Sequence, residues 1–398
     1  MLPESWKVTT IGAEFDIQLG KMLNKEAKAK YPQYKYLTNV NVRWGSFDLS
    51  DLNEMYFSEA DQKKFTLKKG DLLVCEGGEI GRCAIWQDEL ENCFYQKALH
   101  RVRAKADASV EFLKSFLEYN VLNNKLVNLV GRTSIAHLPK EKLEAIPLAL
   151  PPLAEQKKIA EILSTWDEAI SVVDKQLENC RQQKKALMQQ LLTGKKRLPG
   201  FAGEWKKYSI GELLYEADGS IPWSDEQYYN LLSVKRRSEG VVLRETLQGT
   251  KILTKKMNEV ASGDFIISKM QVVHGAWGMV PECYDRHHVS DSYIILRPKK
   301  NKLYIPFFDY FCSQKIMYHK ALQSSYGVHI EKMTFNLDLF MLEKISIPSD
   351  IEEQKEIYNL LNCHDQMCSS LEQKKNALLE EKKSLMQQLL TGKKRVAV

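Results

Sequence analysis

The sequence predicts an α+β protein made of two copies of one plan, each a globular domain of mixed strands and helices followed by a long helix. A repeat is the first observation behind this prediction: Leu187–Arg197 recurs as Leu385–Arg395, with 11 identities at an offset of 198 positions. The second observation is a long three-four spacing of apolar residues in the same two regions, which is typical of a coiled coil. A repeat at a fixed offset indicates an internal duplication, for which we expect pseudo-twofold symmetry.

Shorter matches extend this duplication over the whole chain. Three pairs of landmarks stand at nearly the same offset: Trp6-Lys7 with Trp205-Lys206, Gly70-Asp71 with Gly263-Asp264, and Glu155-Gln156-Lys157 with Glu353-Gln354-Lys355. The residues between the landmarks differ, so we expect a duplicated frame that carries two unlike inserts. We divide the chain into a first globular domain, a central helix, a second globular domain and a C-terminal helix with a basic tail, at residues 1–153, 154–194, 195–350 and 351–398.

Apolar residues on one helical face predict each long helix. In the first region these are Ile159, Leu163, Trp166, Ile170, Val173, Leu177, Cys180, Leu187 and Leu191. In the second region they are Ile357, Leu361, His364, Cys368, Leu371, Leu378, Leu385 and Leu389. Lys184, Lys375 and Lys382 interrupt the two patterns. Because so long a seam needs a partner, we expect the helices to pack on each other as an antiparallel coiled coil that spaces the two domains. Pairing with a second copy of the chain is the alternative.

Local signals mark where each long helix begins and ends. Pro151-Pro152 precedes the first helix, and Ser349-Asp350 precedes the second, where Glu352-Glu353 would complete a capping box. The Glu-Gln-Lys landmark falls in the first turn of each helix, so we expect it to cap the helix start. Gly194 and Gly392 follow the last apolar residues, as expected of a glycine in the left-handed conformation that ends a helix. Inside the inserts, residues 110–130 and 305–323 predict further helices among short strands.

Composition excludes several classes of protein. Of the 398 residues 44% are hydrophobic and 27% are charged, which is typical of a folded chain and excludes wholesale disorder. No apolar run approaches the ~20 residues of a membrane span and no signal peptide is visible, so we expect a cytoplasmic protein without membrane association. The eight cysteines include no C-x-x-C pair and are expected to be reduced thiols. The net charge of +6 is small, so any nucleic-acid binding has to come from local clusters.

Signatures of catalysis and of metal binding are missing from the sequence. Thr193–Lys196 lacks the preceding glycine of a phosphate-binding loop. Leu150–Leu153 lacks the polar first residue of the Asn/Asp-Pro-Pro-aromatic motif of adenine methyltransferases. His287-His288 and His364 have no further ligands at a useful spacing. We therefore expect no enzyme activity, no metal and no cofactor in this chain.

The frame resembles the specificity (S) subunits of type I restriction-modification systems. The resemblance rests on Leu150–Ile159, which reads LPPLAEQKKI, on the helix end Leu191–Gly194, and on Leu198–Phe201 leading to Glu204-Trp205. The alternation of two variable domains with two long helices is similar over the full length. The second helix departs from the family pattern, because Ser349–Glu352 replaces the Pro-Leu-Ala start.

The resemblance implies a DNA-reading subunit without catalytic activity. Each insert would be a target recognition domain for one half of a bipartite, asymmetric site in double-stranded DNA. The helices would set the separation of the halves and dock the modification subunits. The implied partners are modification (methyltransferase) subunits, two of them, and restriction (nuclease and translocase) subunits. Those partners would bring S-adenosylmethionine, ATP and Mg.

Polar loops at matching places in the two inserts are the candidate DNA contacts, because hydrogen-bonding side chains read base edges in the major groove. In the first insert the candidates are Thr38, Asn39, Asn41, Arg43 and Trp44, followed in a later loop by Arg132, Thr133, Ser134 and His137. In the second insert they are Ser233, Lys235, Arg236, Arg237, Lys269, Gln271, Ser325, Tyr326 and His329, with His274 and Trp277 close to Gln271.

Two other classes of function stay open on the sequence alone. One is an interaction scaffold, with two folded modules on a coiled coil and no nucleic-acid binding. The other is an autonomous DNA enzyme, which the missing motifs disfavour. Salt-sensitive, sequence-specific binding to a duplex would distinguish a DNA reader from a scaffold.

Overall fold

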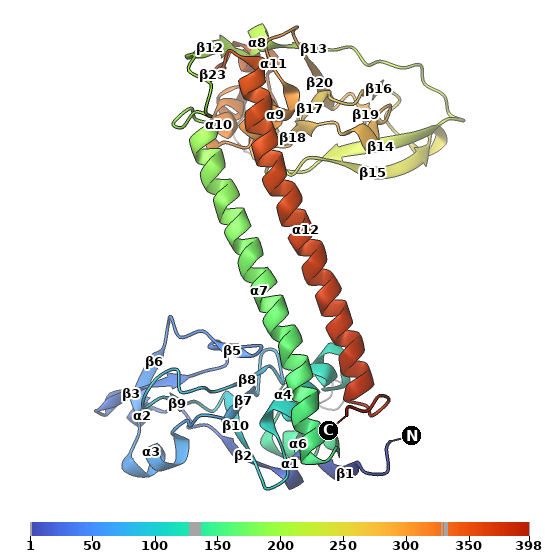
Figure 1. The fold of residues 1–398 in the computed structure, drawn as a ribbon. Helices are drawn as coiled ribbons and strands as arrows, with labels where there is room; N and C mark the ends of the chain where they lie inside the picture. The colour runs from blue at the N-terminus through green and yellow to red at the C-terminus, as the bar shows by residue number, and fades with distance from the viewer. Residues whose placement is uncertain (1, 127–136, 328, 330–332, 398) are drawn as a thin grey trace. The chain divides into compact units, whose positions relative to one another are not determined.

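The chain, described here from a computed structural model, divides into two compact units (Figure 1). The described residues are 2–126, 137–327, 329 and 333–397. Unit 1 comprises residues 1–175 and 373–398, and unit 2 comprises residues 176–372. Each unit contains one α+β domain, a part of α7 (Leu153–Leu191) and a part of α12 (Ile351–Leu389).

A four-stranded antiparallel sheet forms the centre of the domain in unit 1. Its strands are, in spatial order, β2 (Phe15–Leu19), β10 (Leu99–Ala104), β7 (Leu72–Cys75) and β8 (Cys83–Ile85). Every residue of β7 is buried, because alternate side chains enter different cores. Leu72 and Val74 pack in the core that includes α4 (Val110–Leu122), whereas Leu73 and Cys75 pack in a second core.

Smaller elements complete the domain of unit 1. The second core lies under a sheet of β6 (Asn53–Tyr56), β3 (Gln33–Leu37) and β9 (Phe94–Tyr95). Two strand pairs are β1 (Lys7–Thr10) with β11 (Pro147–Leu150), and β4 (Val42–Arg43) with β5 (Ser46–Phe47). The short helices are α1 (Ile11–Glu14), α2 (Lys25–Ala29), α3 (Glu59–Phe65) and α6 (Lys140–Glu144). The β1–β11 pair joins the start of the domain to the segment that leads into α7.

The domain of unit 2 repeats this plan, which confirms the duplication. Its central sheet has the equivalent order β13 (Leu214–Glu216), β20 (Tyr293–Pro298), β17 (Phe265–Ser268) and β18 (Trp277–Met279). As β1 pairs with β11, so β12 (Trp205–Ser209) pairs with β23 (Lys344–Pro348). A second sheet consists of β15 (Val241–Gln248), β14 (Tyr228–Val234), β19 (His288–Ser290) and β16 (Met257–Glu259).

The other elements of unit 2 are short. Its helices are α8 (Ile210–Leu213), α9 (Ile305–Cys312), α10 (Lys315–Gln323) and α11 (Leu337–Leu342). Single 3₁₀ turns are η1 (Gly249–Lys251), η2 (Val272–His274) and η3 (Glu282–Tyr284). A small hairpin pairs β21 (Ser325–Tyr326) with β22 (Thr334–Phe335). Helix α10 packs on η2, which places the end of the second sequence insert beside the loop after β17.

The Gly-Asp landmark has the same structural role in both domains. Asp71 is buried and accepts two hydrogen bonds from the guanidinium of Arg103, at 2.5 and 2.8 Å. Asp264 is buried in the equivalent place and accepts the same pair of bonds from Arg297, at 2.6 and 2.9 Å. In both domains the ion pair joins the start of one strand of the central sheet to its neighbour, so the landmark is structural.

The two long helices begin and end where the sequence signals predict. Each helix has 39 residues, which gives a length of about 58 Å. Helix α7 starts directly after Pro152, and α12 starts after Asp350, whose carboxylate accepts a hydrogen bond from the Glu352 amide at 2.9 Å. Gly194 and Gly392 take the left-handed conformation, with φ of +69° and +71°. The capping box predicted for α12 is wrong, because Glu353 binds a distant arginine.

Within each unit the two helices pack on each other in antiparallel fashion. In unit 1, Asp167 and Asp174 of α7 pair with Lys382 and Lys375 of α12, both at 2.6 Å. Residue numbers rise along one helix as they fall along the other. In unit 2, Cys180 of α7 contacts Cys368 of α12, and Lys184 contacts Asp365, so the residue numbers again run in opposite directions. The antiparallel coiled coil is therefore confirmed within one chain, and the homodimer alternative is not needed to cover the seam.

The lysines that interrupt the predicted seam take part in the pairing. Lys382 is 4% exposed and binds Asp167 of α7 together with Glu118 of α4. Its repeat equivalent Lys184 binds Asp365, the equivalent of Asp167, at 2.5 Å. A lysine in an apolar seam is stable only when its charge is paired. These pairs also favour one register, since sliding either helix would separate lysine from carboxylate.

The Glu-Gln pairs at the helix starts do not act as caps, contrary to the sequence prediction. The Glu155 side chain is fully buried and binds the Arg395 guanidinium, at 2.6 and 2.8 Å, and the Trp6 indole, at 3.2 Å. In unit 2, Glu353 binds Arg197 equivalently, at 2.5 and 2.6 Å. The physical reason is burial: the first turn lies inside the domain, where a carboxylate needs an opposite charge.

The adjacent glutamines bind main chain of the domain. Gln156 accepts a hydrogen bond from the Ser109 amide at 2.9 Å and donates to the carbonyls of Asp107 and Pro151. Gln354 makes the equivalent bonds: it accepts from the Tyr304 amide at 2.8 Å and donates to the main-chain carbonyls of Lys302 and Pro348. Both glutamine side chains are completely buried, so each fixes the start of a long helix to the start of a domain helix.

Two predicted helices differ in extent from the structure. The helix expected over 305–323 is divided into α9 and α10, because the chain turns at Ser313-Gln314. The Ser313 amide and hydroxyl both donate to the Tyr310 carbonyl, which satisfies the end of α9 locally. The helix expected over 110–130 ends at Leu122, and the last part of that prediction lies outside the described residues. In the part of the chain that the structure describes, no helix is both long and apolar enough to span a bilayer.

We predict that Lys382→Ala destabilises the protein by about 2–4 kcal/mol, because it leaves Asp167 and Glu118 without their shared cation. Urea unfolding followed by circular dichroism measures the change. Lys383→Ala is the matched control: it removes an exposed lysine from the same turn and should cost less than about 0.5 kcal/mol. Equal effects of the two substitutions would contradict the role given to the buried lysine.

We also predict a pH-dependent contribution from Asp167. Burial alone would raise the pKa of this carboxyl, but Lys114 and Lys382 outweigh it and hold the pKa below its ordinary value of 3.8. A lowered pKa adds stability above the unfolded value, and this is lost as the pH falls through the folded pKa. The stability advantage of the native chain over Asp167→Asn should therefore be full at pH 7 and shrink below about pH 4. Glu168→Gln, at an exposed neighbour, should show no such difference in urea unfolding.

Candidate functional site

The loop that follows β3 in unit 1 is shaped by Asn41. This side chain is buried, and its carbonyl accepts hydrogen bonds from the amide and the hydroxyl of Thr38, both at 3.0 Å. Its amide group donates to the main-chain carbonyls of Asp48 and Asp51, at 3.1 and 2.9 Å. The polar groups of Asn41 are thus used within the loop, whereas Asn39 and Arg43 lie at least partly in solvent.

A second loop, Glu76–Arg82 between β7 and β8, packs against the first. Asn39 donates from its side chain to the Gly77 carbonyl at 3.4 Å, and the Arg82 guanidinium donates to the Asn39 carbonyl at 2.7 Å. The Trp44 indole donates to the Glu79 carboxylate at 2.7 Å. The structure therefore places Asn39 and Trp44 on one surface with Glu79 and Arg82.

His137 joins this surface from a distant part of the chain. It forms an isolated β-bridge with Gly77, and its Nε2 lies 3.6 Å from the Glu76 carboxylate. Arg43 extends from the same region and pairs with Asp48 at 3.3 Å; both side chains are well exposed. Hydrogen bonds from Ser50, and then from Arg43, lower the pKa of Asp48. The other predicted residues of the later loop, Arg132, Thr133 and Ser134, lie outside the described residues.

In unit 2 the basic residues Lys235, Arg236 and Arg237 form the turn of the β14–β15 hairpin, visible in Figure 1. All three are exposed, and Ser233 precedes them on β14. Arg237 and Ser238 both have positive φ, at 62° and 54°, which is unusual for side-chain-bearing residues. The turn is therefore held in one particular conformation by its surroundings.

The loop between β17 and β18 supplies those surroundings. The amides of Arg237 and Ser238 donate to the carbonyls of His274 and Gly275, at 2.7 and 2.9 Å. The Ser238 hydroxyl lies 2.9 Å from both the Trp277 indole nitrogen and the Tyr318 hydroxyl. A Cβ on Gly275 would lie 2.5 Å from the Tyr318 ring, so only glycine lets α10 approach this closely.

The remaining candidates of unit 2 lie around this turn and this loop. Lys269 donates from its amine to the Asp291 carbonyl at 2.7 Å, and the buried Oε1 atom of Gln271 accepts no hydrogen bond from the described residues. Ser325 and Tyr326 form β21 directly after α10, where Tyr326 is 58% exposed. His329 is exposed in the segment that follows.

Equivalent segments meet in the two units but carry unlike side chains. In each domain the loop after a strand of the second sheet packs on the loop between the last two strands of the central sheet. The loops of unit 1 present amide, indole, carboxylate and separate guanidinium groups, whereas the hairpin turn of unit 2 presents three cationic side chains in a row. Glu79, Arg82, Ser238 and Tyr318 were not among the predicted residues. One sequence signal points to Glu79 and Arg82. Their segment, Glu76–Arg82, follows the first Gly-Asp landmark, just as the candidate segment Lys269–Gly275 follows the second.

Within the described ranges, no group of three or more histidine, cysteine or acidic residues is arranged to hold a metal ion.

Comparison with known proteins identifies the domain type of both halves. A family model described as the type I restriction modification DNA specificity domain matches the chain twice, over residues 3–179 and 203–381. These two matches support DNA sequence recognition and not the alternative of a scaffold without nucleic acid.

Similar proteins cover nearly the full length. The putative type I restriction enzyme MjaX specificity subunit of Methanocaldococcus jannaschii is 26% identical over 99% of this chain and 95% of its own length. The MjaVIII specificity subunit of the same organism is 24% identical over 99% and 94%.

Among solved structures, the S subunit of a type I restriction-modification system from M. genitalium covers 98% of this chain and 97% of its own, with a TM-score of 0.59 and 16% identity. The HsdS subunit from Thermoanaerobacter tengcongensis covers 98% of each chain, with a TM-score of 0.50 and 16% identity. These likenesses concern the fold. Because the family model matches both halves of the sequence, the chain belongs to the family of type I restriction-modification DNA specificity subunits.

Proposed function

We propose that each domain reads one half of a bipartite, asymmetric site in double-stranded DNA, and that α7 and α12 set the separation between the halves. The observation that carries this proposal is the pair of loop clusters in equivalent places with different chemistry. Equivalent placement suits two readers of one duplex, and unlike side chains suit two different half-sites. A specificity subunit has a non-catalytic role, and the enzymatic activities of the complex belong to other subunits.

The chemistry of each loop cluster suggests how its half-site is read. In unit 2, Arg236 and Arg237 carry the fork of donors that matches the O6 and N7 acceptors of guanine, and Lys235 suits a phosphate. This proposed surface also includes the polar residues Ser233, Lys269, Gln271, Ser325, Tyr326 and His329. In unit 1, the Asn39 amide group could form hydrogen bonds with an adenine edge. Contacts to base edges in the groove and to the DNA backbone are assigned to Arg43, Trp44 and His137.

Thr38 and Asn41 have a different proposed role from their neighbours. Because the Asn41 side chain is buried and bonded to Thr38 and two carbonyls, we assign both residues to shaping the loop that presents Asn39. Arg132, Thr133 and Ser134 stay in the proposal on the sequence alone.

The same proposal covers the frame and its partners. Residues 1–153 and 195–350 would be the recognition domains, and 154–194 and 351–398 the spacer helices. Two modification subunits would dock on the two long helices, which are duplicated, and restriction subunits would complete the complex. S-adenosylmethionine, ATP and Mg would be held by those partners, in the cytoplasm, where the complex meets DNA.

We predict that Arg237→Glu weakens binding to the specific duplex by about 10- to 100-fold, because one cation–base contact is lost and repulsion is added. The target is first mapped by sequencing methylated sites in cells that co-express the modification subunit. Binding of the complex is then measured on duplexes with either half altered. Only discrimination in the half read by unit 2 should disappear. Lys300→Glu makes the same charge change at an exposed site outside the loop cluster and should leave both halves discriminated. Arg132→Glu should affect the other half.

We predict opposite consequences for two asparagines of one loop. Asn41→Ala should reduce the free energy of unfolding by about 1–3 kcal/mol, because it leaves buried loop donors and acceptors unpaired. Asn39→Ala should leave the unfolding free energy nearly unchanged and weaken specific binding about 5- to 100-fold. Urea unfolding and fluorescence anisotropy with the mapped duplex measure the two effects. Loss of stability from Asn39→Ala, with binding retained, would contradict the role given to Asn39, and unchanged stability in Asn41→Ala would contradict the role given to Asn41.

A further inference from the structure

Two thiols meet across the helix pair of unit 2. Cys180 of α7 and Cys368 of α12 have their sulfur atoms 2.8 Å apart, and the two residues are 2% and 9% exposed. Both are free thiols. A disulfide has a sulfur–sulfur distance of about 2.05 Å, so closing this pair needs a movement of less than about 1 Å. The antiparallel packing of α7 and α12 therefore brings the two thiols close together.

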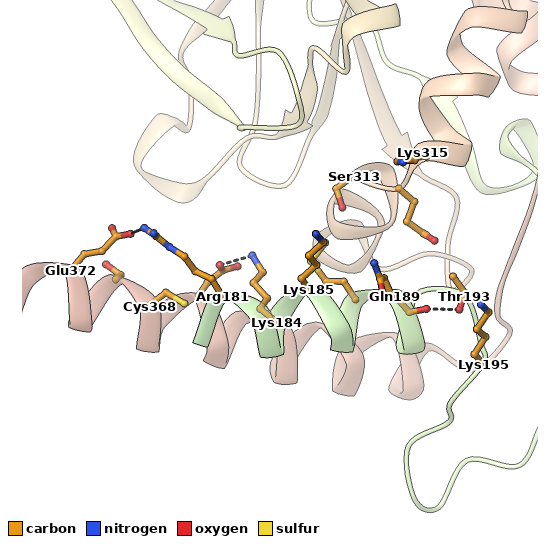
Figure 2. A pocket seen from close by; sticks show the side chains of 14 residues that line it. Arg181, Lys184, Lys185, Gln189, Thr193, Lys195, Ser313, Lys315, Cys368 and Glu372 are labelled. Atoms are coloured by element: carbon orange, nitrogen blue, oxygen red, sulfur yellow. Dashed lines mark hydrogen bonds and ion pairs between the residues drawn. The ribbon is translucent and has the colours of Figure 1, made fainter. Parts of the chain in front are cut away.

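A cavity of about 760 Å³ opens next to this pair and reaches Cys368. One side of the cavity is formed by α7 and α12, and the other by the turn between α9 and α10 at Ser313-Gln314. Figure 2 shows Lys185 and Gln189 extending from α7 towards the segment that carries Ser313 and Lys315. The turn at Ser313-Gln314, which divides the predicted helix, forms this wall of the cavity. Cys368 is the thiol that a small molecule in the cavity would meet first.

The cavity carries an excess of positive charge. Its two acidic residues are already paired: Asp365 with Lys184, and Glu372 with Arg181. Lys185, Lys195 and Lys315 also line it, and no carboxylate of the described residues forms an ion pair with any of them. Met188 adds apolar surface to the cavity. Such a cavity favours a small molecule with carboxylates and an apolar reactive centre.

We propose that Cys180 and Cys368 form a thiol-modification site for anionic low-molecular-weight disulfides of the glutathione type, which convert the pair into a disulfide between α7 and α12. In the first step the Cys368 thiolate attacks one sulfur of the small disulfide, a mixed disulfide forms, and one small thiolate leaves. In the second step the Cys180 thiolate attacks the Cys368 sulfur, the interhelical bond forms, and the second small thiolate leaves. The two protein thiols are oxidised, the small disulfide is reduced to two thiols, and their protons balance the two thiolates released.

The environment of Cys368 determines the rate of the first step. Burial, followed by the hydrogen bond to Cys180 and the charge of Asp365, raises the pKa of Cys368 to about 11, and Lys184 lowers it in part. His364 of α12 lies against the other thiol, with its Nδ1 4.0 Å from the Cys180 sulfur. Only a small fraction is thiolate at neutral pH, so the exchange is slow and accelerates as the pH rises.

The test treats the full-length chain with oxidised glutathione and maps its disulfides by peptide mass spectrometry. Cys283→Ser and Cys363→Ser are built in, because these two cysteines are exposed and would form adducts of their own. We expect a 180–368 disulfide, a rise in Tm of about 5–10 °C because the bond closes a long loop, and faster formation at higher pH. In Cys180→Ser the reaction should stop at a glutathione adduct on Cys368.

Charge variants test the part played by the cavity. Lys185→Glu combined with Lys315→Glu should slow the reaction with oxidised glutathione at least fivefold and leave the reaction with the uncharged 2-hydroxyethyl disulfide unchanged. Lys383→Glu, at the repeat equivalent of Lys185 and outside the cavity, should affect neither. Absence of the 180–368 bond with both reagents would overturn the site. Equal slowing with both reagents would overturn the selection for anions.

Discussion

A buried carboxylate–guanidinium pair at the start of each long helix is the interaction on which the rest of the frame depends. Glu155 and Glu353 are almost completely buried, and an unpaired carboxylate in such a position would cost several kcal/mol. Each finds its arginine just beyond the end of the other helix, Arg395 for Glu155 and Arg197 for Glu353. Because a helix start and the other helix's end must meet in each domain, parallel packing of α7 and α12 is excluded. One type of ion pair, used twice, thus fixes the direction of the helices.

The lysines of the seam fix the register of α7 against α12, in addition to the direction set by the buried ion pairs. Apolar residues alone would let two helices of this length slide by a turn with little change in buried area. Lys382 with Asp167, and Lys184 with Asp365, each lose their partner in any other register. The duplication keeps both pairs in equivalent places, and the surrounding residues differ: Lys114 and Glu118 surround the first pair, and Tyr310 the second. The frame is therefore held symmetrically at its charged contacts, while the packing around them has diverged.

Much of this frame could be predicted from the sequence. The features that could not be predicted lack a distinctive local sequence signal. The repeat, the seam and the glycines that end each helix are local patterns, and they gave the helix ends within a few residues. The sequence predicts a capping role for Glu155, because no local signal distinguishes a cap from an ion pair whose arginine lies 240 positions away. The sequence does not predict the turn at Ser313-Gln314, because neither residue is a strong helix breaker.

The candidate site divides in the same way. Its loops were found from their polar residues, but the inward direction of Asn41, and the presence of Glu79, Arg82 and Tyr318, depend on which loops meet in space.

The division of the chain into units has a consequence for the order in which the protein matures during synthesis. Unit 2 is one uninterrupted stretch of sequence, so all of its internal contacts can form once residue 372 has left the ribosome. Unit 1 needs residues 373–398 as well, and until Arg395 is made, Glu155 has no guanidinium to bind. The domain that is translated first is therefore the last to be completed. Until the last 26 residues are made, the nascent chain therefore carries a first domain whose core lacks Met386, Leu389 and Leu390.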